Sequence, residues 1–234
     1  MAKGKGSVPP TSKPSGRRAT VRVKTAKGRT TSSQRWLQRQ LNDPYVAEAK
    51  KRGYRSRAAF KLLQIDDQFH FLKVGARVVD LGAAPGGWTQ VAVERVKPER
   101  GHGIVIGIDI TPVEPIAGAT VLAKDFYDED APALLTDLLA GPADVVLSDM
   151  AASATGDTQT DHLRIMGLAE AAHDFACQVL KPGGTFVAKV LRGGTERTLL
   201  DRLKHDFAKV RHTKPEASRA DSAEMYVVGT GFRG

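Results

Sequence analysis

The chain has 234 residues, of which 41% are hydrophobic, and its 35 Lys and Arg against 26 Asp and Glu give a net charge of +9. No apolar run approaches the about 18 residues that a membrane-spanning helix needs, and the N-terminal segment MAKGKGSVPP lacks the apolar stretch of a secretory signal. The single cysteine, Cys177, excludes an internal disulfide framework and a zinc cluster built from cysteines. We therefore expect a reduced, cytoplasmic, basic globular protein with no membrane partner.

The positive charge is concentrated at one end of the chain. Residues 1–61 hold 17 Lys and Arg but only two acids, whereas residues 62–234 hold 18 Lys and Arg and 24 acids. Clustered cations favour binding to a polyanion, because neutralising its phosphates releases condensed counterions. Residues 1–30 also lack the large apolar side chains that would offset the entropy of ordering, so we predict a disordered basic leader there. The alternative role for this leader is a passive, solvated tail.

The remaining residues, 31–234, are predicted to form one domain. Helices are predicted over 32–41, from Asp43-Pro44 onward and over 57–69, which makes residues 31–72 a helical N-terminal part. Alternating strands and helices follow, with strands over 76–81, 103–110, 119–126, 143–149, 185–191, 208–215 and 223–231 and helices over 88–96, 132–140, 161–180 and 195–207. This order predicts a doubly wound α/β sheet of seven strands, mostly parallel, with helices on both faces and a hairpin-like edge at the C-terminus.

A Gly-rich turn, residues 82–87 (GAAPGG), follows the first predicted strand. Ligands of open α/β sheets bind beyond the carboxyl ends of the strands, and glycines there let a ligand approach the main chain. The spacing is not the G-x-G-x-x-G of dinucleotide sites, and Pro85 removes one amide donor from any phosphate cradle. The turn therefore suits a ligand without a pyrophosphate, such as a nucleoside with an amino-acid tail.

Two acids end neighbouring strands at the same edge of the predicted sheet. Asp109 follows GIVIGI, where a carboxylate can accept hydrogen bonds from both hydroxyls of a ribose. Asp125 follows ATVLAK, where it can meet an adenine amino group. Either acid alone is more simply a helix cap or a solvated turn residue. Together with the Gly-rich turn they indicate S-adenosylmethionine as the cofactor, with NAD as the weaker alternative.

Five segments carry a specific family resemblance. They are residues 43–62 (DPYVAEAKKRGYRSRAAFKL), 78–90 (VVDLGAAPGGWTQ), 147–151 (LSDMA), 180–190 (LKPGGTFVAKV) and 218–231 (SRADSAEMYVVGTG). Together they resemble the FtsJ/RrmJ (RlmE) family of ribosomal RNA 2′-O-ribose methyltransferases, which have the Rossmann-like fold of class I methyltransferases. The resemblance runs from about residue 33 to the C-terminus, so the basic leader lies outside it.

The resemblance implies an S-adenosylmethionine-dependent enzyme that methylates the ribose 2′-O of a uridine in 23S ribosomal RNA, in the A-loop of the large ribosomal subunit. It implies a catalytic tetrad of Lys61, Asp149, Lys189 and Glu224. It implies cofactor contacts by Gly86, Trp88, Asp109, Asp125 and Asp149. None of the six histidines has metal-ligand spacing, so we expect no catalytic metal.

Lys189 is the candidate general base, because the reaction must remove a proton from a weakly acidic hydroxyl. An ordinary lysine amine is almost entirely protonated at neutral pH. Burial and the like charge of Lys61 favour the neutral amine, whereas Asp149 and Glu224 favour the cation, and the sequence leaves the balance open. We expect Asp149 to orient Lys189 and touch the cofactor, and Lys61 and Glu224 to fix the ribose and the lysine network.

Several basic residues precede Lys61 and are expected to hold phosphates and present a ribose: Lys50, Lys51, Arg52, Arg55 and Arg57. Tyr54 among them is expected either to stack on a base or to pack in the core. The expected partner is ribosomal RNA, with the chain acting as a monomer and without an obligate protein partner.

Three alternative functions stay open. The same tetrad can act on a transfer RNA or on the cap of a messenger RNA. A non-catalytic RNA-binding factor of ribosome assembly could keep the same fold, although an intact tetrad argues against this. An NAD oxidoreductase is disfavoured by the spacing of the Gly-rich turn and by the lack of a residue suited to hydride chemistry.

Overall fold

The structure is a computed structural model that describes residue 21 and residues 30–101, 103–152, 155–192 and 196–234. Apart from Val21 and Thr30, the predicted basic leader, residues 1–30, lies outside the described residues. No helix in these ranges combines the length and the apolar character that crossing a membrane requires.

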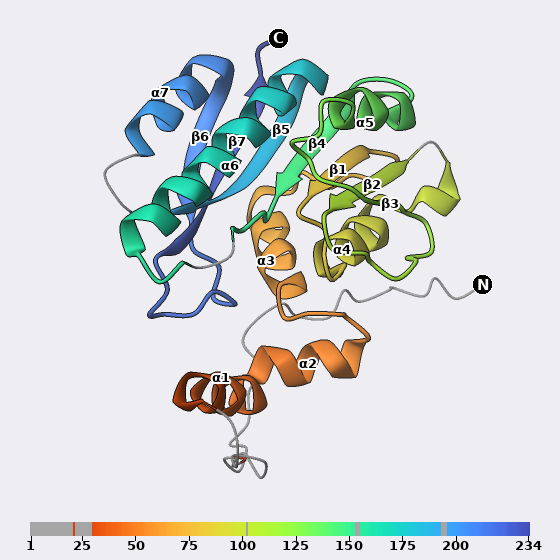
Figure 1. The fold of residues 1–234 in the computed structure, drawn as a ribbon. Helices are drawn as coiled ribbons and strands as arrows, with labels where there is room; N and C mark the ends of the chain where they lie inside the picture. Colours follow the sequence, from red (N-terminus) through yellow and green to blue (C-terminus); the bar gives the residue numbers. More distant parts are fainter. Residues whose placement is uncertain (1–20, 22–29, 102, 153–154, 193–195) are drawn as a thin grey trace, which may run out of the picture.

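A seven-stranded sheet organises the domain, in the order β3-β2-β1-β4-β5-β7-β6 (Figure 1). The strands are β1 (Arg77–Leu81), β2 (Ile104–Asp109), β3 (Thr120–Ala123), β4 (Ala143–Ser148), β5 (Leu180–Leu191), β6 (Phe207–Thr213) and β7 (Glu224–Phe232). Strands β1 to β5 pair in parallel, and β7 is antiparallel to both of its neighbours. The predicted mostly parallel α/β sheet is confirmed. The two C-terminal strands pair with each other as predicted, but β7 lies between β5 and β6, so only β6 forms the edge.

Helices cover both faces of this sheet. Those that cover it are α3 (Ala59–Phe69), α4 (Gly87–Val96), α5 (Ala131–Leu139), α6 (Thr158–Val179) and α7 (Glu196–Asp206). Helices α1 (Thr31–Asn42) and α2 (Pro44–Arg52) precede them, and a short 3-10 turn spans Pro98–Arg100. Successive strand residues point to opposite faces. Val78 and Val145 pack with α3 and α4 in one core, whereas Val79 and Val146 pack with α5, α6 and α7 in the other.

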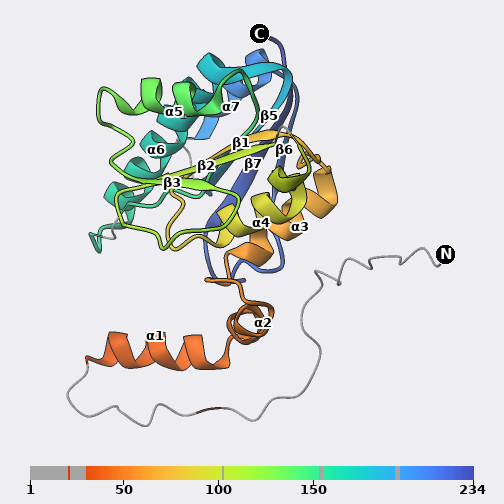
Figure 2. The same cartoon turned by 90° about the vertical axis from the view of Figure 1, so that its right-hand side faces the viewer.

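The first two helices stand off the sheet domain, on the side toward which β4 points (Figures 1 and 2). Thr30 begins α1 by accepting a hydrogen bond from Ser33 N at 3.2 Å, two residues before the predicted start of the helix. Asp43 begins α2 by accepting from Tyr45 N at 2.9 Å. The ring of Tyr45 is buried 5.3 Å from that of Phe60, which anchors α2 to α3.

Strand β5 begins earlier than the sequence predicts. The segment Lys181-Pro182-Gly183-Gly184 ends α6 as expected, because proline lacks a donor and Gly183 has a φ of +84°. The chain nevertheless stays extended from Leu180, which pairs with Ala143 before the β4–β5 register shifts. Because of this shift, the segment that ends α6 also forms the beginning of β5.

Two glycines on different elements provide a matched test of the packing. A Cβ added at Gly229 on β7 would lie 2.8 Å from Cγ of Phe207, whereas a Cβ at Gly167 on α6 meets nothing within 4 Å. We expect Gly229→Ala to lower the free energy of unfolding by about 1–3 kcal/mol through overpacking. We expect Gly167→Ala to raise it by about 0.5–1 kcal/mol, since alanine loses less backbone entropy in a helix. Urea unfolding measures both, and equal stability of the Gly229→Ala variant and the parent would contradict this packing.

Candidate active site

The four residues of the predicted tetrad come from four different elements and meet in space. Lys61 lies on α3, Asp149 directly follows β4, Lys189 lies on β5, and Glu224 is the first residue of β7. The antiparallel pairing of β5 with β7 sets Leu191 opposite Glu224 and Lys189 opposite Tyr226. The register of the sheet therefore brings Lys189 and Glu224 close together, and helix α3 contributes Lys61.

A continuous series of polar contacts joins these side chains. Lys61 Nζ lies 2.7 Å from Glu224 Oε1 and donates to the Tyr226 hydroxyl at 3.1 Å. That hydroxyl donates to Asp149 Oδ1 at 2.9 Å. Lys189 Nζ lies 3.1 Å from Asp149 Oδ1 and donates to the Asp149 carbonyl oxygen at 2.7 Å. Two amines and two carboxylates thus balance in charge, with a phenol between them.

Tyr226 is the member that sequence reasoning missed. Its side chain is fully buried, with its ring 5.5 Å from that of Trp88 and 5.7 Å from Lys61 Nζ. Burial, together with the charge of Asp149, raises the pKa of Tyr226 well above its ordinary value, so the hydroxyl keeps its proton and remains a donor. The available signal was its position two residues after Glu224, which puts both side chains on one face of β7.

Asp149 is ionised at the centre of the group. Burial acts to raise the pKa of this carboxyl, but the charges of Lys189 and Lys61 and the hydrogen bond from Tyr226 outweigh burial and hold it below its usual value. The carboxylate therefore stays available as an acceptor over the whole physiological pH range.

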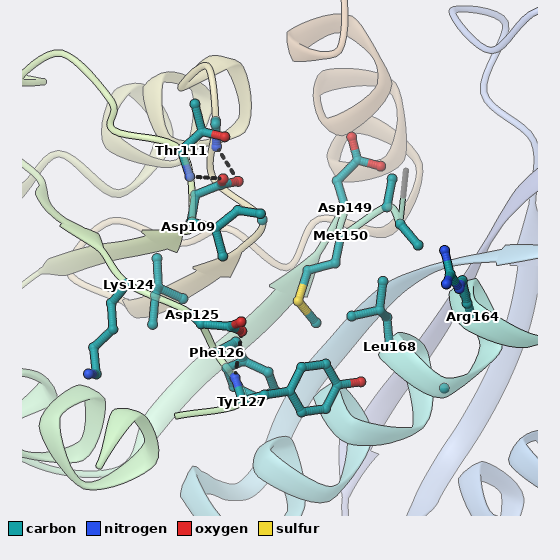
Figure 3. Close-up of a pocket in the computed structure, with 17 residues that line it drawn as sticks. Asp109, Thr111, Lys124, Asp125, Phe126, Tyr127, Asp149, Met150, Arg164 and Leu168 are labelled. Carbon is teal, nitrogen blue, oxygen red and sulfur yellow. Dashed lines mark hydrogen bonds between the residues drawn. The ribbon is translucent and has the colours of Figure 1, made fainter. Parts of the chain in front are cut away.

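A cavity of about 670 Å³ lies at the carboxyl ends of β1, β2 and β4, and Figure 3 shows the side chains around it. Its size falls within the about 300–1,000 Å³ of small-molecule sites. Asp109, Asp125 and Asp149 all line the cavity. Asp149 belongs both to the cavity wall and to the tetrad, so the two sites adjoin.

Local backbone geometry orients the two other acids. Asp109 Oδ2 accepts from Ala84 N in the Gly-rich turn at 2.9 Å, and its Oδ1 accepts from Thr111 N at 2.8 Å (Figure 3). Asp125 Oδ1 accepts from Tyr127 N at 2.9 Å. A carboxylate offers about four lone-pair sites, so each acid can still accept hydrogen bonds from a ligand.

Gly86 and Trp88 do not line the cavity. Trp88 is buried, and its indole donates to the Ala58 carbonyl oxygen at 2.9 Å. Gly86 has a φ of +112°, and a Cβ there would meet Cδ1 of Ile116 at 2.8 Å and Nη1 of Arg55 at 3.0 Å. In this structure Gly86 shapes the Gly-rich turn and Trp88 packs against Tyr226, and contact of either residue with a cofactor stays a prediction.

The chemistry of the cavity fits S-adenosylmethionine. Ribose hydroxyls and an adenine amino group are donors and match carboxylate acceptors, while a sulfonium and an ammonium group match the negative charge. Two cations, Lys124 and Arg164, also line the wall. Lys124 Nζ lies 2.8 Å from Asp128 and 2.9 Å from Asp130, so acids outside the wall balance its charge, and Arg164 alone does not cancel the three lining carboxylates. Ile110, Phe126 and Tyr127 add apolar surface suited to a planar base.

Three of the five basic residues expected to hold phosphates are engaged within the protein. Arg52 pairs with Glu48, and Arg57 pairs with Asp43. Arg55 donates to the carbonyl oxygens of Glu114 and Pro115, at 2.6 and 2.8 Å. Lys50 and Lys51 on α2 are exposed.

Tyr54 packs edge-to-face on Phe60, with the ring centroids 5.8 Å apart, and its hydroxyl donates to Glu94. Of the two roles expected for this side chain, the structure shows the packed one.

Residues 54–232 match the model of the FtsJ-like methyltransferase family. The chain belongs to this family. It is 66% identical over 221 residues to ribosomal RNA large subunit methyltransferase E of Paramagnetospirillum magneticum, covering 93% of this chain and 90% of that protein. It is 62% identical to the protein of the same name from Xanthobacter autotrophicus, covering 94% and 87%.

Solved structures agree with the sequence relatives. A Plasmodium falciparum protein assigned as a ribosomal RNA methyltransferase superposes with a TM-score of 0.68 at 31% identity, covering 77% of this chain and 100% of that one. Membership confirms the Rossmann-like methyltransferase fold and identifies the chain as a methyltransferase whose cofactor is S-adenosylmethionine.

Arg55 connects the helical N-terminal part to the loop that follows Asp109. Removing its guanidinium breaks two short hydrogen bonds to backbone carbonyls beside the cavity. We expect Arg55→Ala to weaken S-adenosylmethionine binding roughly tenfold, the scale of one or two charge-assisted hydrogen bonds. Calorimetric titration measures this. Lys51→Ala, which removes an exposed cation, is the control. Equal S-adenosylmethionine affinities of the two variants would contradict the role of Arg55 in holding the loop that follows Asp109.

Asp80 lies beneath the Gly-rich turn, fully buried, and accepts from the Thr89 hydroxyl at 2.6 Å. Burial, and after it the charges of Asp149 and Asp109, raise the pKa of Asp80 to about 7. The carboxyl of an unfolded aspartate has a pKa of about 3.9. Between about pH 4 and 7 the folded state therefore keeps a proton that the unfolded state has lost, so the free energy of unfolding falls as the pH rises. We expect Asp80→Asn to remove this loss, so that its stability relative to the parent rises over that range in urea unfolding. A pH-independent difference would contradict the raised pKa.

Proposed function

We propose that this protein transfers a methyl group from S-adenosylmethionine to the ribose 2′-O of a uridine in 23S ribosomal RNA, in the A-loop of the large ribosomal subunit. The relatives named above are large-subunit ribosomal RNA methyltransferases at up to 66% identity over almost the whole chain. The specific uridine and the 2′ oxygen are carried over from the family resemblance.

The observation that carries the proposal is that Asp149 belongs both to the cavity wall and to the tetrad. Asp149 lines the cavity that suits the cofactor, and its carboxylate receives Lys189 and Tyr226. A nucleophile held by the tetrad therefore lies beside the methyl donor. Holding two reactants in line removes much of the entropic barrier of a bimolecular displacement.

S-adenosylmethionine, when bound, supplies an electrophilic methyl group on a sulfonium. The protein must then position a ribose hydroxyl and take its proton, and we assign the second task to Lys189 Nζ. In the structure this nitrogen directs two hydrogen bonds at Asp149, one to the carbonyl oxygen and one to Oδ1. The ammonium form that pairs with Asp149 must first release one proton to solvent. The neutral amine then has two N–H groups for these two bonds and one lone pair for the hydroxyl proton.

The other members hold this arrangement. Glu224 and Tyr226 fix Lys61 Nζ, and the Ser218 hydroxyl donates to Glu224 Oε1 at 2.9 Å. We assign to Lys61 the positioning of the ribose.

The proposal also covers how the protein binds its RNA, its oligomeric state and its cellular location. We propose that residues 31–72 face the RNA, with Lys50 and Lys51 toward phosphates, and that the basic leader, residues 1–30, adds salt-dependent attraction. The tetrad and the cavity come from one chain, in keeping with a monomer, and we propose that the protein acts in the cytoplasm. Deleting residues 1–30 should weaken RNA binding and flatten its salt dependence in filter-binding measurements. Unchanged binding would assign the leader another role.

Transfer of tritiated methyl groups tests the function directly. Large ribosomal subunits from cells that lack this protein should accept label from S-adenosylmethionine, and the label should map to one 2′-O-methyluridine in the A-loop. Transfer RNA and capped messenger RNA serve as competing substrates. Preferential labelling of either would replace the ribosomal substrate, and no labelling of any RNA would favour a non-catalytic assembly factor.

Replacing Lys189 isolates the chemical step. We expect Lys189→Ala to lower methyl transfer by at least about 100-fold, the lower end of the contribution of a general base. Calorimetry should show S-adenosylmethionine binding retained within a few fold, because Lys189 does not line the cavity. Lys181→Ala, which removes an exposed lysine from the same strand, is the control. Near-normal turnover of Lys189→Ala would remove this residue from the base role.

A further inference from the structure

A second cluster of reactive side chains lies apart from the cavity and the tetrad. His173 and Cys177 occupy successive turns of α6, and Asp206 ends α7. His173 is completely buried, and its ring packs 5.8 Å from Phe186 and 6.2 Å from Phe207. None of the three residues lines the cavity.

The donor atoms of this cluster converge on one point. His173 Nε2 lies 3.0 Å from Asp206 Oδ2 and 3.4 Å from Cys177 Sγ, and the last two atoms are 3.8 Å apart. Among the residues that the structure describes, this is the one group of three or more His, Cys, Asp or Glu side chains that could share an ion. A nitrogen, a sulfur and a carboxylate oxygen are the three ligand types of protein zinc sites.

We propose that His173, Cys177 and Asp206 form a zinc site that ties α6 to the junction of α7 and β6. Zinc bonds of about 2.0–2.3 Å at tetrahedral angles separate neighbouring ligand atoms by about 3.3–3.6 Å. The observed separations of 3.0, 3.4 and 3.8 Å span that range, so an ion fits after shifts of a few tenths of an ångström. A water molecule would complete the tetrahedron, because the Asp206 side chain is 24% exposed.

The surroundings favour this arrangement. His205 Nδ1 lies 2.7 Å from Asp206 Oδ1, which holds the carboxylate with Oδ2 toward the cluster. His173 Nδ1 has no hydrogen-bond partner, and the nearest carboxylate oxygen, Asp174 Oδ1, is 3.9 Å away. A metal on Nε2 puts the proton on Nδ1, where a small shift of Asp174 would receive it, as carboxylates commonly do for ligating histidines. Arg202 is paired with Asp174, so Asp206 keeps its charge for the ion.

Metal binding requires the thiol to lose its proton. Zn²⁺ takes the place of that proton, which leaves to the solvent, and the bond formed is Sγ–Zn. The role is structural, because the site joins two helices and a strand and adjoins no part of the cavity wall.

The sequence indicated no metal-ligand spacing among the six histidines. A signal was present in the spacing of His173 and Cys177, since residues four apart lie on the same face of a helix. The third ligand comes from Asp206, 29 residues after Cys177. Only the packing of α7 against α6 brings it within reach.

Cobalt substitution tests the site on the full, tag-free chain. Cys177 is the only cysteine, so a thiolate-to-cobalt charge-transfer band in the near ultraviolet can come from no other residue. After chelator treatment, titration with Co²⁺ should give this band with the intense visible bands of tetrahedral coordination, saturating at one ion per chain. Zn²⁺ should displace Co²⁺ and raise the melting temperature of the chelator-treated protein by at least about 4 °C, the scale of 1–2 kcal/mol for a chain of this size. Absence of the charge-transfer band in the folded parent chain would overturn the proposal without any variant.

Two variants identify the ligands. Cys177→Ala should abolish the charge-transfer band, and Asp206→Asn should weaken Zn²⁺ binding at least roughly tenfold. His212→Ala, which removes an exposed histidine of β6, is the control and should bind as the parent does. Each variant should retain S-adenosylmethionine binding, which shows that it folds and separates this test from that of methyl transfer. Unchanged Zn²⁺ affinity in Cys177→Ala and Asp206→Asn would show that the ion binds elsewhere and would overturn the site.

Discussion

The ion pair between Lys189 and Asp149 is the interaction on which the rest of the active site depends. A lysine on a central strand is costly to bury unless a carboxylate and further acceptors meet it. Asp149 supplies both, through its side chain and its own carbonyl oxygen. Because Asp149 is also a residue of the cavity wall, the pair connects the tetrad to the cofactor cavity.

The sheet explains how residues far apart in sequence reach this point. The parallel strands β1, β2 and β4 all end at one edge, which brings together the Gly-rich turn, Asp109 and Asp149. The antiparallel insertion of β7 beside β5 then sets Tyr226 next to Lys189. A parallel strand beside β5 would place different residues there. The antiparallel direction of β7 is therefore what brings Glu224 to the tetrad.

Much of this could be predicted from the sequence. The seven strands follow from apolar runs that both faces of a sheet bury, and the acids Asp109 and Asp125 follow from their positions at strand ends. The spacing of two from Glu224 places Tyr226 on the same face of β7, but it does not show that the hydroxyl is shared between Lys61 and Asp149, because a tyrosine on a buried strand has the same pattern when its hydroxyl is free. The internal use of Arg55 and Arg57 was equally hidden, because their partners lie in other segments. Arg52 differs, since it pairs with Glu48 four residues earlier on the same helix, a spacing that the sequence displays. Trp88 illustrates the same limit, because only the tertiary packing shows its indole turned toward Ala58 and away from the cavity.

The most direct test of the account is a paired measurement on Asp149→Ala, the residue that the cofactor cavity and the tetrad share. S-adenosylmethionine affinity is measured by calorimetry and methyl transfer to large ribosomal subunits by tritium incorporation, both on protein shown to be folded. The account predicts that the affinity falls and that transfer stays lost even at saturating S-adenosylmethionine, because one carboxylate serves both sites. Normal affinity, or transfer restored by saturating S-adenosylmethionine, would contradict the claim that Asp149 joins the two.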